Sequence, residues 1–456
     1  MQLIKVLKKI RSSKFFKNDH ERTFLIKKNI FISLFLKGGS VIITFLLVPI
    51  TINYIDSVQY GIWLTISSMI YWISVFDIGI GNGLKNEIAR SIAVKDESNL
   101  KIFVSTSYAV LAIIAMFIFT IFYFVSFFFN WDNVLNISSK LNINIRLILL
   151  LFIGFFCLQF VLQLLDAVIS AIQQVFMSSL ILFIGQLIAL IIIYILTLFV
   201  PGSLLLLVVV MAGSPLLVSI VATIYLYNTK LKKFAPSFHN IETKHIRNLL
   251  NVGGSFFFIQ IAAMILIYTD NFIITRVLGP GAVTIYYIPF RLFSIISVLF
   301  SIIIIPYWSA FTDAYSTKDI NWIRKNIKKL RMIWLFLSIF GIVIFIFSNF
   351  LYKVWIHDAV FIPVSLSFSM LLYVMVYTWQ TLHVYFLNGI GKIRLQLIVV
   401  IIGAVINIPL SVYLGTNFGL PGIVYANTIV FLIMSVIFTI QYYKIVNQNA
   451  VRIWSK

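Results

Sequence analysis

Long apolar stretches recur along the whole chain and are separated by short polar segments. Each stretch has roughly 20 or more residues, the length that an α-helix needs to cross a hydrocarbon core of about 30 Å. The alternation of apolar and polar positions that is typical of a membrane β-barrel is not found. The pattern predicts twelve spanning helices at residues 29–52, 59–80, 102–128, 147–173, 177–200, 203–227, 249–275, 282–311, 331–349, 363–387, 395–414 and 421–443.

The composition supports the same fold class, an all-α polytopic membrane protein. Of the 456 residues, 61% are hydrophobic and 11% charged, against about a quarter charged in a soluble domain. The single cysteine, Cys157, lies within an apolar stretch, which excludes a disulfide scaffold and a cysteine-based metal site. The first long apolar stretch is too long for a cleaved signal peptide.

The placement of basic residues predicts the orientation in the membrane. Of the 35 Lys and Arg residues, 29 fall in the loops and tails on the side of the N-terminus and four in the opposite loops. Positive residues collect on the cytoplasmic side, so both termini are predicted to be cytoplasmic. The net charge of +21 is therefore mainly a topology signal, and no soluble segment is long enough for a nucleic-acid-binding domain.

Short motifs repeat between the two halves of the chain. Gly38-Gly39-Ser40 recurs at residues 253–255, Lys95-Asp96 at 318–319, and Val200-Pro201-Gly202 at 420–422. The nearly constant spacing predicts two six-helix lobes of the same orientation, as in transporters that rock one lobe against the other. The predicted organisation is a basic cytoplasmic tail (1–28), an N-lobe (29–228), a cytoplasmic linker (229–248), a C-lobe (249–443) and a cytoplasmic tail (444–456).

Catalytic motifs were sought and none was found. The segment 389–394, "GIGKIR", lacks the glycine spacing and the Ser/Thr of a phosphate-binding loop. His383 is the one histidine within a predicted span, and we interpret it as a packing residue. The sequence favours a transporter over an enzyme and predicts no cofactor beyond coupling to H⁺ or Na⁺.

Charged residues within spans are the candidate site residues, because each is costly unless it faces a cavity or a partner. Arg291 lies near the middle of the eighth helix, which favours an anion site over a structural pair. Lys37 in the first helix is nearer the cytoplasmic face, so it is either a second anion-binding residue or a side chain that reaches water. Asp270 has two interpretations: it pairs with Arg291, or it binds a proton or Na⁺ with Asn271 nearby. Asp77 is a further ion-coupling candidate or an interfacial carboxylate.

Glycines and a proline supply candidate bends. Gly79, Gly81 and Gly83 end the second predicted helix, and Pro289 lies two residues before Arg291. Proline removes a helical hydrogen bond, so a bend is expected beside the buried cation.

The stretch 77–89, "DIGIGNGLKNEIA", resembles the end of the second helix in Wzx-type polysaccharide flippases of the MOP (MATE-like) exporter superfamily. The resemblance implies a flippase of the bacterial inner membrane that moves an undecaprenyl-pyrophosphate-linked oligosaccharide, such as an O-antigen or capsule repeat unit, to the outer leaflet. It implies membrane lipids and a polymerase of the same pathway as partners. By helix and depth, Arg291 and Lys37 match positions that lipid II flippases of this superfamily use for substrate.

Two other functions stay open. One is a MATE-type drug or cation antiporter, against which a cation at mid-membrane argues. The other is a membrane glycosyltransferase or polymerase, which is expected to carry more charge in its outer loops. Aromatic residues in the spans are candidates for stacking on sugar rings or, alternatively, for facing lipid: Trp63, Tyr71, Trp72, Tyr286, Tyr287, Tyr307 and Trp308.

Overall fold

A computed structural model describes residues 21–74, 80–93, 97–138, 141, 143–172, 174–242, 261, 264–266, 268–305, 307–357 and 359–455. Within these ranges the chain is helical and has no strand. Asp77 and Gly79, together with most of the seventh predicted helix, lie outside the described residues.

The described part of the first half supplies nine α-helices. They are α2 (Glu21–Ile55), α3 (Ser57–Ser74), α4 (Ile80–Ala93), α5 (Glu97–Phe128), α6 (Trp131–Val134), α7 (Ile145–Leu162), α8 (Leu164–Ala171), α9 (Val175–Phe199) and α10 (Leu204–Asn228). Two short 3₁₀ helices, η3 (Lys232–Phe234) and η4 (Phe238–Asn240), follow in the linker.

The described part of the second half supplies seven α-helices. They are α13 (Asp270–Leu278), α14 (Pro280–Ile304), α15 (Tyr307–Ser316), α16 (Ile320–Ile346), α17 (Ser348–Ile356), α18 (Val364–Gly389) and α19 (Arg394–Val446), before the 3₁₀ helix η6 (Arg452–Ser455). Gly419, with a φ of 65°, interrupts α19, so this element comprises both the eleventh and the twelfth predicted helices.

Eight of the described helices are long and apolar enough to cross a membrane, and α3 and α18 supply two further predicted spans. Two predicted boundaries are wrong. The eighth predicted span, 282–311, is divided into α14 and α15, with Pro306 between them in the sequence. The ninth begins at Ile320 instead of 331, because the Asp319 carboxylate accepts a hydrogen bond from the backbone N–H of Trp322 at 2.9 Å and caps the helix there.

The two halves repeat the same helix order. α3 and α14 begin at Ser57 and Pro280, and α5 and α16 at Glu97 and Ile320, so both pairs are offset by 223 residues. The Pro-Gly pairs at 201–202 and 421–422 both permit close approaches, because a Cβ at Gly202 would collide with the carbonyl of Tyr54 on α2 and a Cβ at Gly422 with the carbonyl of Leu414 on α19. The fold is therefore two lobes of six spanning helices.

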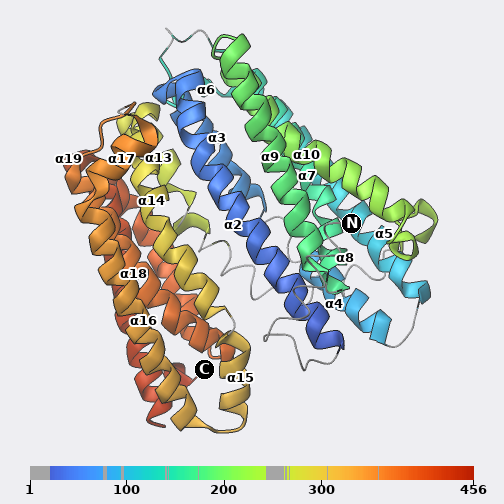
Figure 1. The fold of residues 1–456 in the computed structure, drawn as a ribbon, viewed down its shortest axis with the longest axis vertical. Helices are drawn as coiled ribbons and strands as arrows, with labels where there is room; N and C mark the ends of the chain where they lie inside the picture. The colour runs from blue at the N-terminus through green and yellow to red at the C-terminus, as the bar shows by residue number, and fades with distance from the viewer. Residues whose placement is uncertain are drawn as a thin grey trace.

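The lobes converge at one end and separate at the other. In Figure 1, α3, α13 and α17 lie close together at the upper end, whereas α4 and α15 lie far apart at the lower end. One apolar core joins the lobes and includes Ile52 and Ile62 with Ile274 and Ile288. A second core lies among α4, α5, α7, α8 and the end of α10, and includes Leu231 and Phe234 of the linker.

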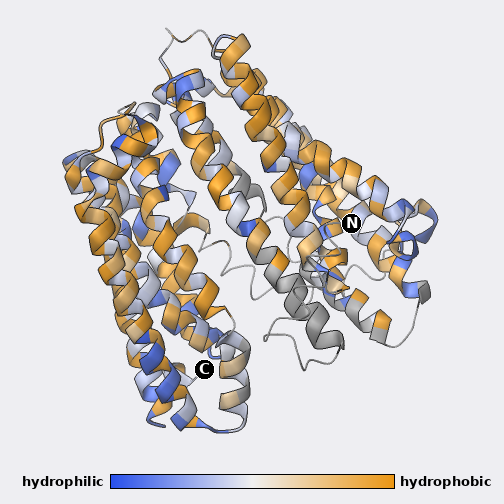
Figure 2. Cartoon of the chain, viewed as in Figure 1, coloured by the Kyte–Doolittle hydropathy of each residue, from blue (hydrophilic) through white to orange (hydrophobic). Residues whose placement is uncertain are grey.

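Apolar side chains also cover the outside of the helices. Phe117 on α5, Phe199 on α9 and Phe336 on α16 are each at least 65% exposed. Figure 2 shows hydrophobic residues along the middle of the helices and hydrophilic residues gathered near their ends. An exposed apolar surface of this extent is suited to lipid, and the chain is a multi-pass membrane protein.

Candidate functional site

The converging ends of the lobes form a close helix contact, which we call the outer seam: the contacts of α3 with α13 and α14. A Cβ at Gly61 would collide with the carbonyl of Pro280, so only glycine permits this approach. The Thr284 hydroxyl donates to the Ser57 carbonyl at 2.6 Å, and the hydroxyls of Thr65 and Thr275 are 2.5 Å apart. Most of these bonds use small side chains, so the helix backbones lie close together.

Loops and a neighbouring helix extend this junction. Arg276 donates to the Asn133 carbonyl at 2.6 Å, which connects α13 to α6 of the N-lobe. The Trp355 indole on α17 donates to the Phe45 carbonyl on α2 at 2.8 Å. The contacts of α3 with α13 and α14, and of α13 with α6, lie at the converging end of the lobes (Figure 1), which the predicted topology places on the outer side.

Arg291 lies on α14, eleven residues beyond the start of that helix, or roughly 16 Å inward along its axis. Its guanidinium carbon lies 5.4 Å from the centre of the Phe45 ring, which belongs to the opposite lobe. Its Nε is buried without a hydrogen-bond partner. No acidic side chain in the described part of the chain pairs with it. The structure therefore places an uncompensated cation between the lobes, just inside the outer seam.

Asp270, on α13, is buried in a polar network instead of pairing with Arg291. Its Oδ2 accepts from the Tyr286 hydroxyl at 2.7 Å and from the Asn427 amide at 2.6 Å. Asn427 in turn accepts from the Asn407 amide at 2.7 Å. The predicted alternative of an Asp270–Arg291 ion pair is wrong, because neutral donors from α14 and α19 surround the carboxylate.

Three oxygens of this region are buried and have no described partner. They are Asp270 Oδ1, Asn407 Oδ1 and Ser411 Oγ, and residues 407 and 411 share one face of α19 because they are one helical turn apart. Buried polar atoms are normally satisfied. The arrangement is suited to a proton or a small hard cation.

The other predicted site residues take different places. Asn271 points at the other lobe, where its amide donates to the Leu64 carbonyl at 3.3 Å, so it belongs to the outer seam and not to the Asp270 network. Lys37 is exposed on α2, two residues from the inner end of the span at Phe35–Ile55. It lies eight residues, or roughly 12 Å, inward of Phe45 on the same helix.

The predicted bends are partly described. Gly81 and Gly83 lie in the first turn of α4, whose Leu84 and Ile88 are buried while Lys85 is exposed. The continuation after the glycines is thus an amphipathic helix packed on the N-lobe. Pro289 is buried within a continuous α14.

The sequence reading missed a third cation within the spans. Arg331 is the first residue of the predicted span 331–349 and was not singled out there; it lies inside α16 with its guanidinium carbon 5.4, 5.2 and 5.2 Å from the ring centres of Trp379, Tyr442 and Tyr443. It donates to the Tyr443 hydroxyl at 2.7 Å and lies 3.4 Å from Nε2 of the fully buried His383. The cap at Asp319 was the signal that could have found it.

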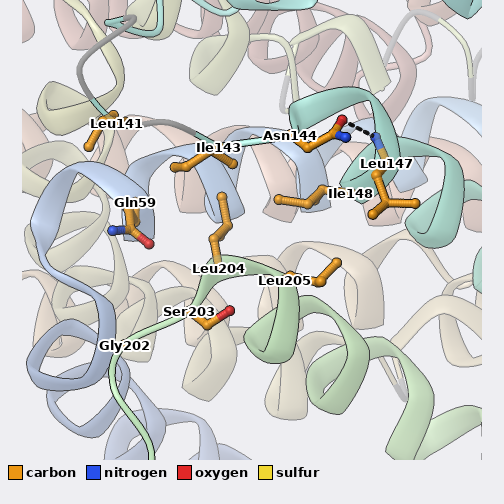
Figure 3. Close-up of a pocket in the computed structure, with 10 residues that line it drawn as sticks. All are labelled: Gln59, Leu141, Ile143, Asn144, Leu147, Ile148, Gly202, Ser203, Leu204 and Leu205. Atoms are coloured by element: carbon orange, nitrogen blue, oxygen red, sulfur yellow. Dashed lines mark hydrogen bonds between the residues drawn. The ribbon is translucent and has the colours of Figure 1, made fainter.

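The described chain also contains cavities, in the C-lobe, in the N-lobe and beside the linker. One of about 150 Å³ lies between α14 and α18; Phe290 and Ser294 line it, but Arg291, which lies between them in the sequence, does not. Another of about 280 Å³, drawn in Figure 3, lies in the N-lobe among Gln59, Asn144 and Leu204; Figure 3 shows its Asn144 side chain turned back to cap α7. A third of about 280 Å³ lies between α5 and the linker at Ser237.

Comparisons with known proteins agree with this architecture. A family model described as "Polysaccharide biosynthesis protein" matches residues 26–312. No curated protein sequence matches significantly.

Solved structures match over most of their length at low identity. The lipid II flippase MurJ in an inward closed conformation matches with a TM-score of 0.69 at 15% identity, over 91% of this chain and 87% of that one. An inward-facing multidrug resistance MATE transporter of the MOP superfamily matches with 0.67 at 13% identity, over 91% and 95%. An outward-facing MATE transporter of the same superfamily gives 0.60 at 13%, over 93% and 96%. At such identities the likeness shows the fold.

Proposed function

Because the chain belongs to the polysaccharide biosynthesis protein family and has the fold of MOP-superfamily transporters, we propose that it is a flippase for a lipid-linked oligosaccharide. The substrate is a repeat unit of O-antigen, capsule or a similar surface polysaccharide, linked by pyrophosphate to undecaprenol. The protein acts as a transporter and not as an enzyme. It works in the bacterial inner membrane, beside the polymerase that uses the delivered unit.

Arg291 is the observation that carries this proposal. A guanidinium within a span is expensive to keep, and this one lacks an acidic partner in the described chain. A diphosphate group supplies the missing negative charge and accepts two parallel hydrogen bonds from arginine. Lys37, farther inward on α2, supplies a second positive charge along the way from the cytoplasmic face.

The arrangement of the lobes supports loading from the cytoplasm. The lobes are bonded at the outer seam and separate at the inner ends of α4 and α15 (Figure 1). In the predicted orientation the diphosphate reaches Arg291 from the cytoplasmic leaflet, and rupture of the outer seam releases it outward. This is alternating access by rocking of two lobes.

Asp270 and its network supply the coupling ion site in this proposal. One carboxylate oxygen has two donors and the other has none. A proton or Na⁺ on the second oxygen, with Asn407 and Ser411 nearby, neutralises the buried charge. Ion binding at this position couples the gradient to the C-lobe, since α13 and α14 also form the outer seam.

The test is transport by the purified full chain in vesicles. A polyprenyl diphosphate carrying a labelled oligosaccharide is placed in one leaflet, and its arrival in the other is followed by a membrane-impermeant glycosidase. We expect protein-dependent translocation of this lipid and none of ethidium, a cationic drug. Ethidium transport without lipid translocation would support the MATE-type antiporter and reject the flippase.

A further inference from the structure

The cavity between α14 and α18 has a construction that the diphosphate site does not need. Its walls carry four aromatic side chains, Phe290, Phe293, Tyr373 and Tyr377, and two serines, Ser294 and Ser297. Ligand pockets are commonly built in this way, with apolar walls and a few polar groups that fix the orientation of the ligand.

The aromatic walls are held in place from behind. Tyr373 and Tyr377 stack on each other at 5.9 Å and 24°, and both meet Phe431 of α19 edge-on. On the facing helix, Phe290 stacks on Tyr286 at 5.9 Å and 13°, and the Tyr286 hydroxyl is bonded to Asp270. The ring faces are therefore preorganised before a ligand arrives.

Hydroxyl groups stand at the same level as Arg291. The Ser294 hydroxyl donates to the Arg291 carbonyl at 2.7 Å and keeps lone pairs free to accept. The Ser297 hydroxyl has no partner in the described part of the chain. Phe290 and Ser294, which line the cavity, lie one and three residues from Arg291 on α14, so a diphosphate on Arg291 and a group in the cavity would lie along the same part of this helix.

The volume selects a ligand group of about one ring. A cavity of about 150 Å³ is large enough to hold benzene, and this cavity has about 150 Å³. Both groups attached to a lipid diphosphate, the first sugar and the first isoprene units, are of this scale.

A sugar gains more binding free energy from such a cavity than an isoprene unit does. An isoprene unit loses little by staying in the bilayer, because lipid tails are as apolar as the cavity wall. A sugar that leaves water needs compensating contacts. Aromatic faces cover the apolar side of a pyranose ring, and the serine hydroxyls bond to its polar edge.

We propose that the cavity lined by Phe290, Tyr373, Tyr377 and Ser297 is a subsite for the sugar attached directly to the diphosphate. This inference rests on the proposed flippase function and adds to it a selection for the first sugar. The subsite binds only the sugar ring attached to the diphosphate, and the remaining sugars of the repeat unit extend into the space between the lobes.

The experiment measures binding to the purified full chain in detergent with two kinds of probe. One is farnesyl diphosphate, and the other is the same lipid carrying one glucose, galactose or N-acetylglucosamine on its terminal phosphate. We expect the best glycosylated probe to bind about tenfold more tightly than farnesyl diphosphate, as an aromatic contact and a hydrogen bond provide. Ser297→Leu, which fills the cavity, and Tyr377→Leu, which removes a ring face, reduce this ratio to less than about twofold.

Ser301→Leu is the matched control, since Ser301 lies one turn farther along α14 and does not line the cavity. It retains the wild-type ratio. A ratio that is unchanged in Ser297→Leu overturns the proposal, and so does a wild-type ratio near one. Equal weakening of both probes by Ser297→Leu assigns the cavity to the isoprenoid and also overturns it.

A failure of the proposed flippase function gives a different experimental result from a failure of the sugar subsite. Arg291→Ala weakens both probes by the same factor and preserves their ratio if Arg291 holds the diphosphate. If Arg291→Ala changes neither affinity, Arg291 does not bind the diphosphate. The ratio of the affinities of the glycosylated probe and farnesyl diphosphate then still tests the sugar subsite.

Discussion

Arg291 and Arg331 lie on neighbouring helices of the same lobe, and both are cations within spans that lack an acidic partner in the described chain. Arg331 lies among three aromatic rings, a tyrosine hydroxyl and an imidazole, all from its own lobe. The Nδ1 of His383 lies 3.0 Å from the Trp379 carbonyl; since a carbonyl only accepts, Nε2 is left to accept from Arg331. Arg291 has one phenylalanine ring, from the other lobe.

The difference separates two uses of a buried cation. Rings and neutral acceptors of its own lobe compensate part of the desolvation cost of Arg331, although its Nε, like that of Arg291, has no hydrogen-bond partner in the described chain. Arg291 lies at the boundary between the lobes, where in the proposed function a ligand supplies the missing partner. Four experiments test this distinction.

The largest difference is expected in transport itself. Arg291→Ala should reduce delivery of surface polysaccharide more than about 100-fold, because two charge-assisted hydrogen bonds to diphosphate are lost. Arg331→Ala should retain at least about a tenth of the parent level, once corrected for protein amount by immunoblot. Equal losses in the two variants would mean that Arg291 is as structural as Arg331.

The second-largest effect is expected from substitution of Asp270, the acidic residue that does not pair with Arg291. Asp270→Asn removes the ionisable group but keeps a side chain of the same size, so we expect the stimulation of transport by an ion gradient to fall about tenfold. Asn271→Ala, at the outer seam, should preserve that stimulation. The measurement is lipid translocation in vesicles with and without imposed proton and Na⁺ gradients. Undiminished stimulation in Asp270→Asn would exclude coupling at this residue.

A smaller effect is expected from opening the boundary at which Arg291 lies. Gly61→Val forces α3 away from Pro280 and should shift the population toward states with a separated outer seam. A cysteine in place of Thr284, in a Cys157→Ser background, should then react about threefold faster with a membrane-impermeant maleimide.

Gly38→Val is the control for this change, because a Cβ at Gly38 meets nothing within 4 Å. Equal labelling of the two glycine variants would show that the seam does not depend on the close approach at Gly61.

The smallest effect is thermal. Arg331→Met loses the cation–ring contacts and should lower the melting temperature of the detergent-solubilised protein by about 3 °C. Arg291→Met should leave it unchanged or raise it, since an uncompensated charge is removed. A lower melting temperature for Arg291→Met than for Arg331→Met would reverse the assignment of the two residues.

Helices were predictable from the sequence where the length of an apolar segment alone identifies a membrane span. Apolar length identified α5, α9 and α10 within a few residues of their ends. It failed at α16, because the first eleven residues of that helix extend beyond the apolar segment, with Ile323, Ile327 and Leu330 buried on one face. The i, i+4 spacing and the cap at Asp319 mark this extension, whereas a search for uniform hydrophobicity passes over it.

The candidate site was predictable only as single residues. Arg291 and Asp270 attract attention because charges are rare within spans. Their surroundings were not predictable: Asn427 is 157 residues from Asp270 along the chain, and Phe45 lies in the other lobe from Arg291. The interpretation in which Asp270 pairs with Arg291 was wrong for this reason.

The sequence by itself determined that the helices lie in lipid, how many they are, their repeat in two halves and the predicted orientation. These depend on local properties, namely the apolar length of a segment and the charge of the adjacent loop, which act before helices meet. Only the tertiary structure decided which polar groups pair, which cation lacks a partner and which end of the lobes is closed. Those outcomes depend on contacts between helices distant in the chain, and a contact that Gly61 permits is fixed by the shape of both surfaces at once.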